Sequence, residues 1–510
     1  MNDESTNTDE RPSAGDAVDG FPDDLPEQMQ VRLAKRARMV ESGTEPYPSG
    51  VERTAHLGDL VQRYPALAPD EATGEVVTIA GRVIFIRSTG KLCFARLREG
   101  DDEIQVMLSL DRVGADSLAR WKSLVDIGDQ MSVTGEVVSS RRGELSVMAD
   151  DWAITAKALR PLPVAHKPLS EETQVRQRYV DLIVNPAARR MVRARADVLA
   201  SIRETMRRHD FIEVETPVLQ SLHGGAAARP FATHVNAFDS EFYLRISLEL
   251  YLKRLVVGGL ERVYEMGRIF RNEGIDATHA PEFTMIEAYQ AYGDCRSIAA
   301  VTRDMVVDAA HALDTTVVSD DHGGEVDLTA PWPWVPVQDV VSGVIGEEVT
   351  LDSDPARLRR LAERLEVEVP PHASAGVTIF ELYEKLGEHT VLAPTFVCDY
   401  PAEVRPLART RSDDPRIADG ADVVIGGVEL VTLYSELADP VEQRTRLLEQ
   451  AGLAVDDPEA MVLDEDFLRA LEHGLPPTGG MGMGIDRLLR VLTGEHSLRQ
   501  IVAFPLLRAD

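Results

Sequence analysis

The feature that most constrains the fold is a change of hydrophobic period along the 510-residue chain. Between about Glu75 and Asp151, apolar and polar residues alternate in five short segments, among them VVTIAGRVIFIR and KLCFARLRE, which are separated by Gly and charged turns. A period of two is that of a β-strand, and several short strands in so small a span are typical of a closed barrel. We therefore predict a small closed β-barrel in the first third of the chain.

The outer face of this barrel carries a candidate nucleic-acid contact. In KLCFARLRE the alternation points Phe94 outward, with Arg96 and Arg98 on the same face. A barrel that binds oligonucleotides uses such a ring to stack a base and the arginines to hold phosphates. A single exposed Phe also occurs on barrels for ordinary structural reasons. The residues alone leave both interpretations open.

The first residues predict a tail and a helix. Residues 1–26 are rich in Asp, Glu, Ser, Gly and Pro and poor in large apolar groups, so we predict a disordered acidic tail. Residues 27–42 place Met29, Leu33 and Met39 among basic residues, which predicts an amphipathic helix with a basic face. That face is either solvated or in contact with RNA. Its basic residues are Arg32, Lys35, Arg36 and Arg38.

Charge and cysteine content exclude several classes of protein. The net charge is −31, so binding to a polyanion requires a local basic patch, and indiscriminate DNA binding is not expected. Cys93, Cys295 and Cys398 lie far apart, which excludes a disulfide framework and a four-cysteine zinc site. No apolar run approaches the roughly 18 residues that cross a bilayer, and no secretory signal follows Met1. We therefore expect a cytoplasmic protein without a membrane contact.

A second, larger domain follows the barrel. Residues 161–175 contain several prolines and no apolar periodicity, which predicts a linker. The N-terminal helix and the barrel then occupy residues 27–160, and the large domain occupies residues 176–510.

The large domain predicts an α+β fold. A long helix from Pro186 to His209 leads into a strand that ends at Pro217. The later strands are joined by short turns or by long irregular insertions, which favours a mainly antiparallel sheet flanked by helices. Residues 352–390 predict a helical insertion.

Two segments of this domain predict a nucleotide site. In YEMGRIFRNEG, Arg271 and Glu273 share a strand face; a guanidinium can hold a phosphate, and a carboxylate can accept a hydrogen bond from an adenine amino group. In HAPEFTMIEAYQAY, Phe283 can stack on a purine while Glu287, on the same face, receives a cation. The ordinary alternatives are a surface Arg–Glu pair and a half-buried strand with one tolerated acid.

A third segment, GGMGMGIDRLL, provides a strand face without side chains. Gly480, Gly482 and Gly484 alternate, so a ligand can lie against the backbone before Arg487 begins a helix. The spacing is not GxGxxG, which argues against a Rossmann dinucleotide site.

Together these segments resemble the class II aminoacyl-tRNA synthetases, and within them the lysyl-tRNA synthetase family. Residues 190–217, ending in FIEVETP, are similar to the first family motif, FRNEG with His279 and Phe283 to the second, and GMGMGIDR to the third. The segments GGAAARPF, LELYLKRLVVGG and HAPEFTM narrow the resemblance to the lysyl type. The resemblance extends over about residues 27–508. It is nearest to actinobacterial forms and to the synthetase-like half of bifunctional lysyl-phosphatidylglycerol proteins. It implies an OB-fold anticodon domain before a class II catalytic domain.

The resemblance implies roles for residues of the nucleotide site. Arg271 would hold the α-phosphate of ATP and Arg487 would contact the nucleotide from the other side, which makes both residues catalytic. Glu273 would read the adenine amino group and Phe283 would stack on the ring. His279 would approach the outer phosphates.

The same resemblance implies sites for metal, amino acid and anticodon. Asp422 and Glu429 would bind Mg²⁺ between the phosphates, a task for hard oxygen ligands. Two carboxylates around one buried ammonium would reject neutral isosteres, which leave the carboxylates unpaired. The implied lysine-binding residues are Gly225 and Glu249 at the α-amino group, Glu287, Tyr289 and Glu436 at the ε-ammonium group, and Thr432 and Tyr434. The implied anticodon readers are Phe94, Gln105 and Glu144.

One segment departs from the family pattern. The family usually reads GNGFSEL or GTAYSEL where this chain reads VTLYSEL, residues 431–437. Glu429 and Glu436 have opposite strand parity, so a bulge is predicted between them if both face the site. Val431 and Leu433 are bulky, and we expect them to narrow or shift the lysine pocket.

The resemblance thus implies a ligase that activates lysine with ATP and transfers it to tRNA(Lys). It also implies a homodimer, with the helix from Pro186 to His209 at a two-fold interface. Two alternatives stay open. A paralogue that uses another acceptor or amino acid is favoured by VTLYSEL and opposed by the barrel. An inactive RNA-binding module is opposed by the retention of Arg271, Glu273, Phe283, Glu429 and Arg487.

Overall fold

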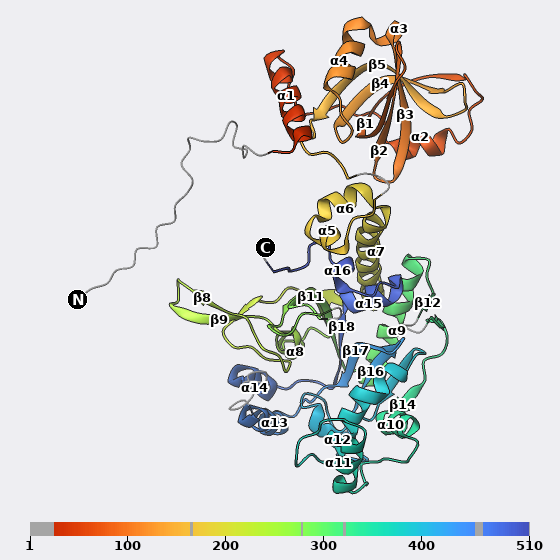
Figure 1. Cartoon of the computed structure of the whole chain (residues 1–510). Helices are drawn as coiled ribbons and strands as arrows, with labels where there is room; N and C mark the ends of the chain where they lie inside the picture. Colours follow the sequence, from red (N-terminus) through yellow and green to blue (C-terminus); the bar gives the residue numbers. More distant parts are fainter. Residues whose placement is uncertain (1–24, 164–166, 277–278, 320–322, 454–462, 509–510) are drawn as a thin grey trace. The chain divides into compact units, whose positions relative to one another are not determined.

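The computed structural model describes residues 25–163, 167–276, 279–319, 323–453 and 463–508. The chain divides into two compact units, residues 1–174 with 179–186 and residues 175–178 with 187–510 (Figure 1). Nearly all of the predicted acidic tail lies outside the described residues. None of the helices within the described ranges is long and apolar enough to cross a membrane.

The first unit contains the predicted closed barrel, with strand order β1-β2-β3-β5-β4. Alternate positions of the second strand confirm the predicted orientation, because Cys93, Ala95 and Leu97 are buried whereas Phe94 is half-buried and Arg96 is exposed. The strands are β1 Ala72–Ser88, β2 Leu92–Glu99, β3 Asp102–Ser109, β4 Gln130–Ser139 and β5 Leu145–Ala156. The helices are α1 Glu27–Glu41, α2 Leu57–Arg63, α3 Leu110–Val113 and α4 Ala115–Leu124.

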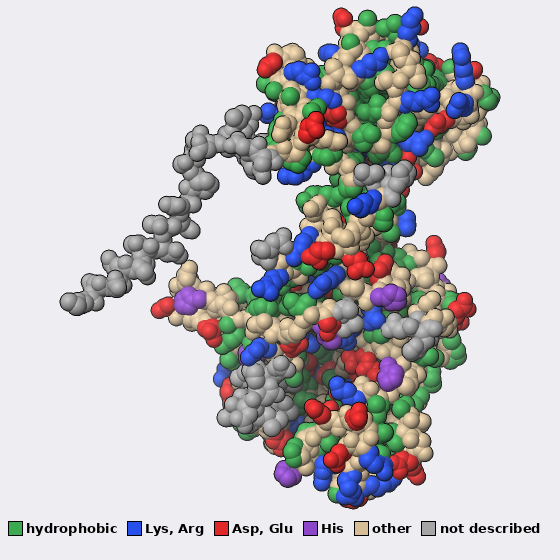
Figure 2. Space-filling view, viewed as in Figure 1, with side chains coloured by type: hydrophobic (Ala, Val, Ile, Leu, Met, Phe, Trp, Pro, Cys, Tyr) green, Lys and Arg blue, Asp and Glu red, His purple; other side chains and the backbone are tan. Residues whose placement is uncertain are grey.

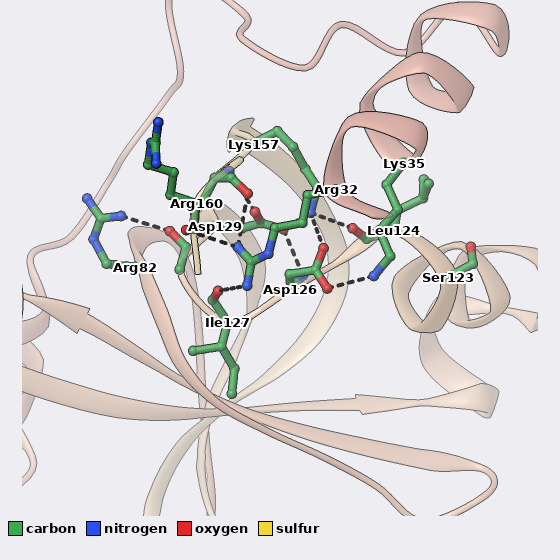
Figure 3. Close-up of polar contacts among 12 residues, drawn as sticks. Arg32, Lys35, Arg82, Ser123, Leu124, Asp126, Ile127, Asp129, Lys157 and Arg160 are labelled. Carbon is green, nitrogen blue, oxygen red and sulfur yellow. Dashed lines mark hydrogen bonds and ion pairs between the residues drawn. The ribbon is translucent and has the colours of Figure 1, made fainter. Parts of the chain in front are cut away.

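Helix α1 uses part of its basic face to dock on the barrel (Figure 3). Arg32 is 7% exposed and donates to the carbonyls of Ile127 at 2.9 Å and Ala158 at 3.0 Å. Lys35 lies 2.6 Å from Asp126. These two cations are therefore structural, which neither the solvated nor the RNA-contacting interpretation of the helix predicted.

The same cluster continues into the barrel wall. Lys157, whose side chain is fully buried, lies 2.6 Å from Asp126 and 2.8 Å from Asp129. Because a buried ion pair is costly to break, this cluster should fix the angle between helix and barrel.

The junction between the units differs from a plain linker. Helix α5, Glu171–Arg176, begins within the predicted linker, and α6, Arg178–Val184, belongs mostly to the first unit. One reason is a hydrogen bond of 3.3 Å from Arg98 of the barrel to the carbonyl of Ile183.

The second unit is built on an eight-stranded sheet of order β14-β15-β16-β17-β18-β11-β10-β6. The pairs β14–β15 and β10–β6 are parallel and the other neighbours are antiparallel, which confirms the predicted sheet type. The strands are β6 Ile212–Glu213, β10 Arg262–Phe270, β11 Glu282–Ala291, β14 Trp334–Pro336, β15 Thr395–Cys398, β16 Gly420–Ile425, β17 Val428–Ser435 and β18 Thr478–Gly484.

Two small sheets and the helices complete this unit. The small strands are β7 Leu219–Gln220, β8 Ala232–Val235, β9 Ser240–Leu244, β12 Val317–Ser319 and β13 Glu325–Asp327. The helices are α7 Pro186–Arg208, α8 Glu249–Val257, α9 Cys295–Ala312, α10 Val337–Ile345, α11 Pro355–Arg364, α12 Ala375–Leu382, α13 Pro440–Leu453, α14 Glu465–Glu472, α15 Ile485–Thr493 and α16 Leu498–Ile501. A π-helical turn, Tyr383–Gly387, and 3₁₀ turns at Glu388–Thr390 and Ala402–Val404 are also present. Helices α11 and α12 lie within the predicted insertion.

The two faces of the large sheet have different surroundings. On one face, Ile286 of β11, Leu433 of β17 and Met483 of β18 join a core with residues of α7, α9 and α15. On the other face, alternate residues of the same three strands line a cavity. The period of two thus separates a hydrophobic core from a polar site.

Candidate active site

A cavity of about 450 Å³ lies against the central strands of the second unit. Figure 2 shows a hollow in the surface of this unit, with acidic side chains inside it. The cavity brings together segments that are far apart in the sequence. The predicted site residues that line it are Gly225, Glu249, Arg271, Glu273, His279, Phe283, Glu287, Tyr289, Glu429, Thr432, Tyr434, Glu436 and Arg487.

Glycines on β18 leave room for these side chains, as the alternation predicted. A Cβ atom on Gly480 would lie 1.9 Å from Oε1 of Glu436 and 2.7 Å from the ring of Tyr289. Any other residue at this position would therefore displace Glu436 from the cavity. Gly482, by contrast, would meet its neighbours at ordinary contact distances of 3.5 and 3.6 Å.

One end of the cavity is basic and aromatic. The guanidinium carbon of Arg271 lies 5.3 Å from the centroid of the Phe283 ring, and its Nε donates to the carbonyl of Ile246 at 3.3 Å. Burial lowers the pKa of Arg271, although the carboxylate of Glu273 opposes this change. Arg487, at the start of α15, donates to the carbonyl of Glu429 at 3.2 Å. A cation beside an aromatic ring suits an anionic group attached to a flat base.

His279 lies at the edge of this end. Its Nδ1 is 2.9 Å from a carboxylate oxygen of Asp276, and its side chain is 54% exposed. Such a residue is accessible to the outer part of a ligand in the cavity.

The other end of the cavity is acidic. Glu287 is 4% exposed and accepts hydrogen bonds from the Ser247 hydroxyl at 3.0 Å, the Leu248 amide at 2.9 Å and the Tyr289 hydroxyl at 3.2 Å. Burial and the neighbouring Glu249 raise the pKa of Glu287 to about 7. Burial also raises the pKa of Glu436, which is 3% exposed. Both carboxyls would gain from a cationic ligand.

Lys253 contacts two residues of the cavity wall, and the sequence interpretation missed it. Its fully buried Nζ lies 2.6 Å from Oε1 of Glu249 and 2.5 Å from Oε2 of Glu436. Burial opposes its charge, but the two carboxylates outweigh burial and raise its pKa. The spacing of Glu249 and Lys253 on a predicted helix, four residues apart, signals half of this arrangement. The contact with Glu436 depends on the fold.

The implied metal ligands differ from the expectation. Glu429 lines the cavity and its side chain is 36% exposed. Asp422 does not line the cavity, is 1% exposed and forms a salt bridge with Arg405. Across the described part of the chain, no cluster of three or more His, Cys, Asp or Glu side chains is arranged to hold a metal ion. Asp422 is thus paired with Arg405, whereas Glu429 is open to the cavity.

Strand β17 contains the predicted bulge. Val423 of β16 pairs with Val431, whereas the next residue, Val424, pairs with Glu429, so Leu430 is the extra residue. This places Glu429 on the cavity side with Glu436.

The expected narrowing of the pocket was wrong. Val431 is 1% exposed and Leu433 is fully buried, and both belong to the core on the opposite face of the sheet. Because side chains alternate along a strand, their bulk points away from the cavity.

The implied anticodon residues lie together on the outside of the barrel. Phe94 is on β2, Gln105 on β3 donates to the Ser146 hydroxyl at 2.9 Å, and Glu144, just before β5, lies 2.8 Å from Arg96. A ring beside an amide and a paired arginine can stack a base and read its edge.

Comparison with protein families agrees with both units. Residues 77–155 match the family described as "OB-fold nucleic acid binding domain", and residues 170–508 match "tRNA synthetases class II (D, K and N)". The chain therefore belongs to the class II tRNA synthetases, which are ligases. Among individual relatives it stands with the lysine–tRNA ligases, at 53% identity to that of Kineococcus radiotolerans and 51% to that of Mycobacterium tuberculosis H37Rv. Both alignments cover 95% of this chain and 98% of the relative.

A third relative has a longer chain. The lysylphosphatidylglycerol biosynthesis bifunctional protein LysX of Gordonia bronchialis is 45% identical over 95% of this chain but only 42% of its own length.

Proposed function

We propose that this ligase condenses lysine with ATP to lysyl-adenylate and pyrophosphate, and then transfers the lysyl group to the 3′ end of tRNA(Lys). The observation that carries the proposal is the acidic end of the cavity. Three buried carboxylates, Glu249, Glu287 and Glu436, line this end, and the ammonium of Lys253 pairs with two of them, Glu249 and Glu436. This arrangement leaves negative charge for a ligand that brings ammonium groups.

Lysine would bind with its two ammonium groups at this end. We assign the ε-ammonium group to Glu287, Tyr289 and Glu436, because these residues line the cavity and are almost fully buried. Gly225 and Glu249 would hold the α-amino group, with Thr432 and Tyr434 along the chain between. A neutral side chain of the same length would leave buried carboxylates unpaired, which is the basis of rejection.

ATP would occupy the basic and aromatic end. Phe283 would stack on adenine, Glu273 would accept from its amino group, and His279 would reach the outer phosphates. Arg271 and Arg487 would hold the α-phosphate between them.

The reaction needs no covalent nucleophile from the protein. The lysine carboxylate attacks the α-phosphorus, the bond to the bridging oxygen breaks, and pyrophosphate leaves. Negative charge grows on the α-phosphoryl oxygens in the transition state, where Arg271 and Arg487 would stabilise it. Rate enhancement thus comes from alignment and from fixed charges.

Class II ligases of this kind use ATP with a divalent metal ion, and we infer that the ion is Mg²⁺ brought in with ATP. Glu429 is the carboxylate placed to contact it from the cavity wall. When bound, the ion would neutralise part of the charge on the outer phosphates.

tRNA(Lys) would contact the first unit through Phe94, Gln105 and Glu144.

We also infer a homodimer, because the second unit exposes apolar side chains in the segments that follow α7 in the sequence. Ile212 is 52% exposed, Leu219 47% and Phe238 71%. The free thiols of Cys93, Cys295 and Cys398 support a reducing, cytoplasmic location.

One alternative loses the observation that favoured it. A paralogue with another substrate was favoured by Val431 and Leu433, whose side chains lie in the core.

The test is amino-acid-dependent exchange of pyrophosphate into ATP, run with each of the standard amino acids in the absence of tRNA. We expect lysine to support exchange and the neutral amino acids to give only background. Exchange with a different amino acid, or with none, would refute the proposal.

A further inference from the structure

Arg405 forms a salt bridge with Asp422, a carboxylate that the family resemblance assigns to Mg²⁺. It follows the 3₁₀ turn Ala402–Val404 and lines the cavity, with a side chain that is only 15% exposed. Its Nη2 contacts Oδ2 of Asp422. The carboxylate that the family resemblance assigns to Mg²⁺ is thus already paired with a cation of the protein.

Aromatic rings hold this guanidinium in place. Its central carbon lies 4.4 Å from the ring centroid of Tyr400 and 5.4 Å from that of Phe380. Cation–π contacts in a buried site add to the attraction of Asp422. The Nε of Arg405 is buried and has no hydrogen-bond partner within the described residues, so Asp422 and the rings are the contacts that hold this guanidinium.

A divalent ion and Arg405 would compete for the same carboxylate. An ion shared by Asp422 and Glu429 would have to approach the guanidinium closely, and like charges repel strongly where water is largely excluded. The guanidinium is already largely desolvated by the fold and oriented by Asp422 before ATP arrives.

We propose that Arg405 supplies, as a permanent guanidinium at the cavity wall, the positive charge that a metal ion on Asp422 would otherwise supply. This inference rests on the proposed function, because it takes the cavity to be an ATP site. It predicts that the site binds one metal ion fewer than it would with Asp422 unpaired. Arg405 is then a phosphate-neutralising residue that lies outside the three family motifs.

The test counts ions rather than product. Mn²⁺, a paramagnetic substitute for Mg²⁺, is titrated into the full-length protein saturated with β,γ-methylene ATP, and unbound Mn²⁺ is measured by electron paramagnetic resonance. We expect Arg405→Ala to bind one more Mn²⁺ per chain than the native protein. The double variant Arg405→Ala/Asp422→Asn should return to the native number, and Asp422→Asn alone should leave it unchanged.

Two further variants control for the loss of any loop arginine and for misfolding of Arg405→Ala. Arg409→Ala removes an exposed arginine of the same loop and should leave the ion count unchanged. Arg405→Gln retains a hydrogen-bond donor for Asp422 without the charge, so it should fold even if Arg405→Ala does not, and it should also gain an ion.

The result that overturns the inference is a native protein that loses a Mn²⁺ on Asp422→Asn, or a folded Arg405→Gln variant with the native count. Binding of the ATP analogue is measured first. A protein that does not bind it contradicts the proposed function itself, whereas a wrong ion count contradicts only the role of Arg405.

Discussion

At the scale of single residues, the acidic end of the cavity requires that its buried negative charges be balanced. Carboxylates that are almost fully buried are stable as anions only when cations face them. Lys253 provides one such cation from the protein, between Glu249 and Glu436. The ammonium groups of the substrate would provide the remaining positive charge. Substrate binding would thus neutralise the buried carboxylates.

Replacing Lys253 with Met should therefore damage both stability and lysine use. Met retains most of the volume but leaves Glu249 and Glu436 without their shared cation. Removing one partner of a buried pair typically costs about 3 to 5 kcal/mol. We expect a loss of this size in urea unfolding and a raised Michaelis constant for lysine in pyrophosphate exchange. The double variant Lys253→Met/Glu249→Gln should recover part of the stability, and unchanged stability of the single variant would contradict the role of Lys253.

The raised pKa of Glu287 predicts a pH dependence of lysine binding. The carboxyl has a pKa of about 7 in the empty site, and it must be ionised to attract the ammonium group. Lysine affinity should therefore be constant well above pH 7 and should fall by up to about tenfold for each pH unit below it. Calorimetric titration of lysine between about pH 5.5 and 8.5 measures this change. Glu287→Gln should bind lysine weakly and should keep only the part of the dependence that comes from Glu436, whose pKa is also raised. A native affinity that is flat over the range would contradict the assignment.

The sequence predicted those site residues that local periodicity places. Phe283, Glu287 and Tyr289 follow from alternation along one strand. Lys253 and Arg405 were missed because their partners, Glu436 and Asp422, lie on other elements. Such pairs form only when the sheet brings distant segments together, so no local pattern reveals them.

At the scale of elements, strand β17 shows what a bulge achieves. The extra residue, Leu430, lets Glu429 and Glu436 face the cavity although their parity is opposite. The sequence interpretation predicted the bulge but missed that Val431 and Leu433, which alternate with Thr432 and Tyr434, point into the core. The strand expected to end at Pro217 is also shorter, since β6 covers only Ile212–Glu213. Beyond it, the amide and the hydroxyl of Thr216 donate to the side-chain carboxylate of Glu265 instead of continuing the strand.

A core variant of β17 tests this arrangement. Leu433→Ala should lower the free energy of unfolding by about 2 to 5 kcal/mol, as large-to-small changes in a core do. The Michaelis constant for lysine should stay unchanged, because the side chain points away from the cavity. Denaturant unfolding and pyrophosphate exchange on the same preparation measure both effects. An improved lysine constant would mean that Leu433 does restrict the pocket.

At the scale of the whole molecule, recognition of tRNA and chemistry are assigned to different units. The barrel and the catalytic sheet have separate cores. A change on the outside of the barrel should therefore leave amino-acid activation intact.

Phe94→Ala tests this division. Loss of a stacking surface costs about 1 to 3 kcal/mol per base, which corresponds to roughly 5- to 150-fold in tRNA use. We expect the kcat/KM for tRNA charging to fall by this factor in the variant. Pyrophosphate exchange measured without tRNA should stay unchanged. Val76→Ala, which shortens another exposed apolar side chain on the barrel, is the matched control. An equal loss in both assays would contradict the separation of tasks.

The most direct test of the central claim is attachment of labelled amino acid to a tRNA(Lys) transcript by the full-length protein with Mg·ATP. Labelled arginine and ornithine, and a transcript with an altered anticodon, serve as comparisons. We expect a base-labile lysyl ester on tRNA(Lys), little product with the other two amino acids, and reduced product on the altered transcript. Lysine-dependent pyrophosphate exchange without any lysyl-tRNA, or efficient transfer of another amino acid, would contradict it.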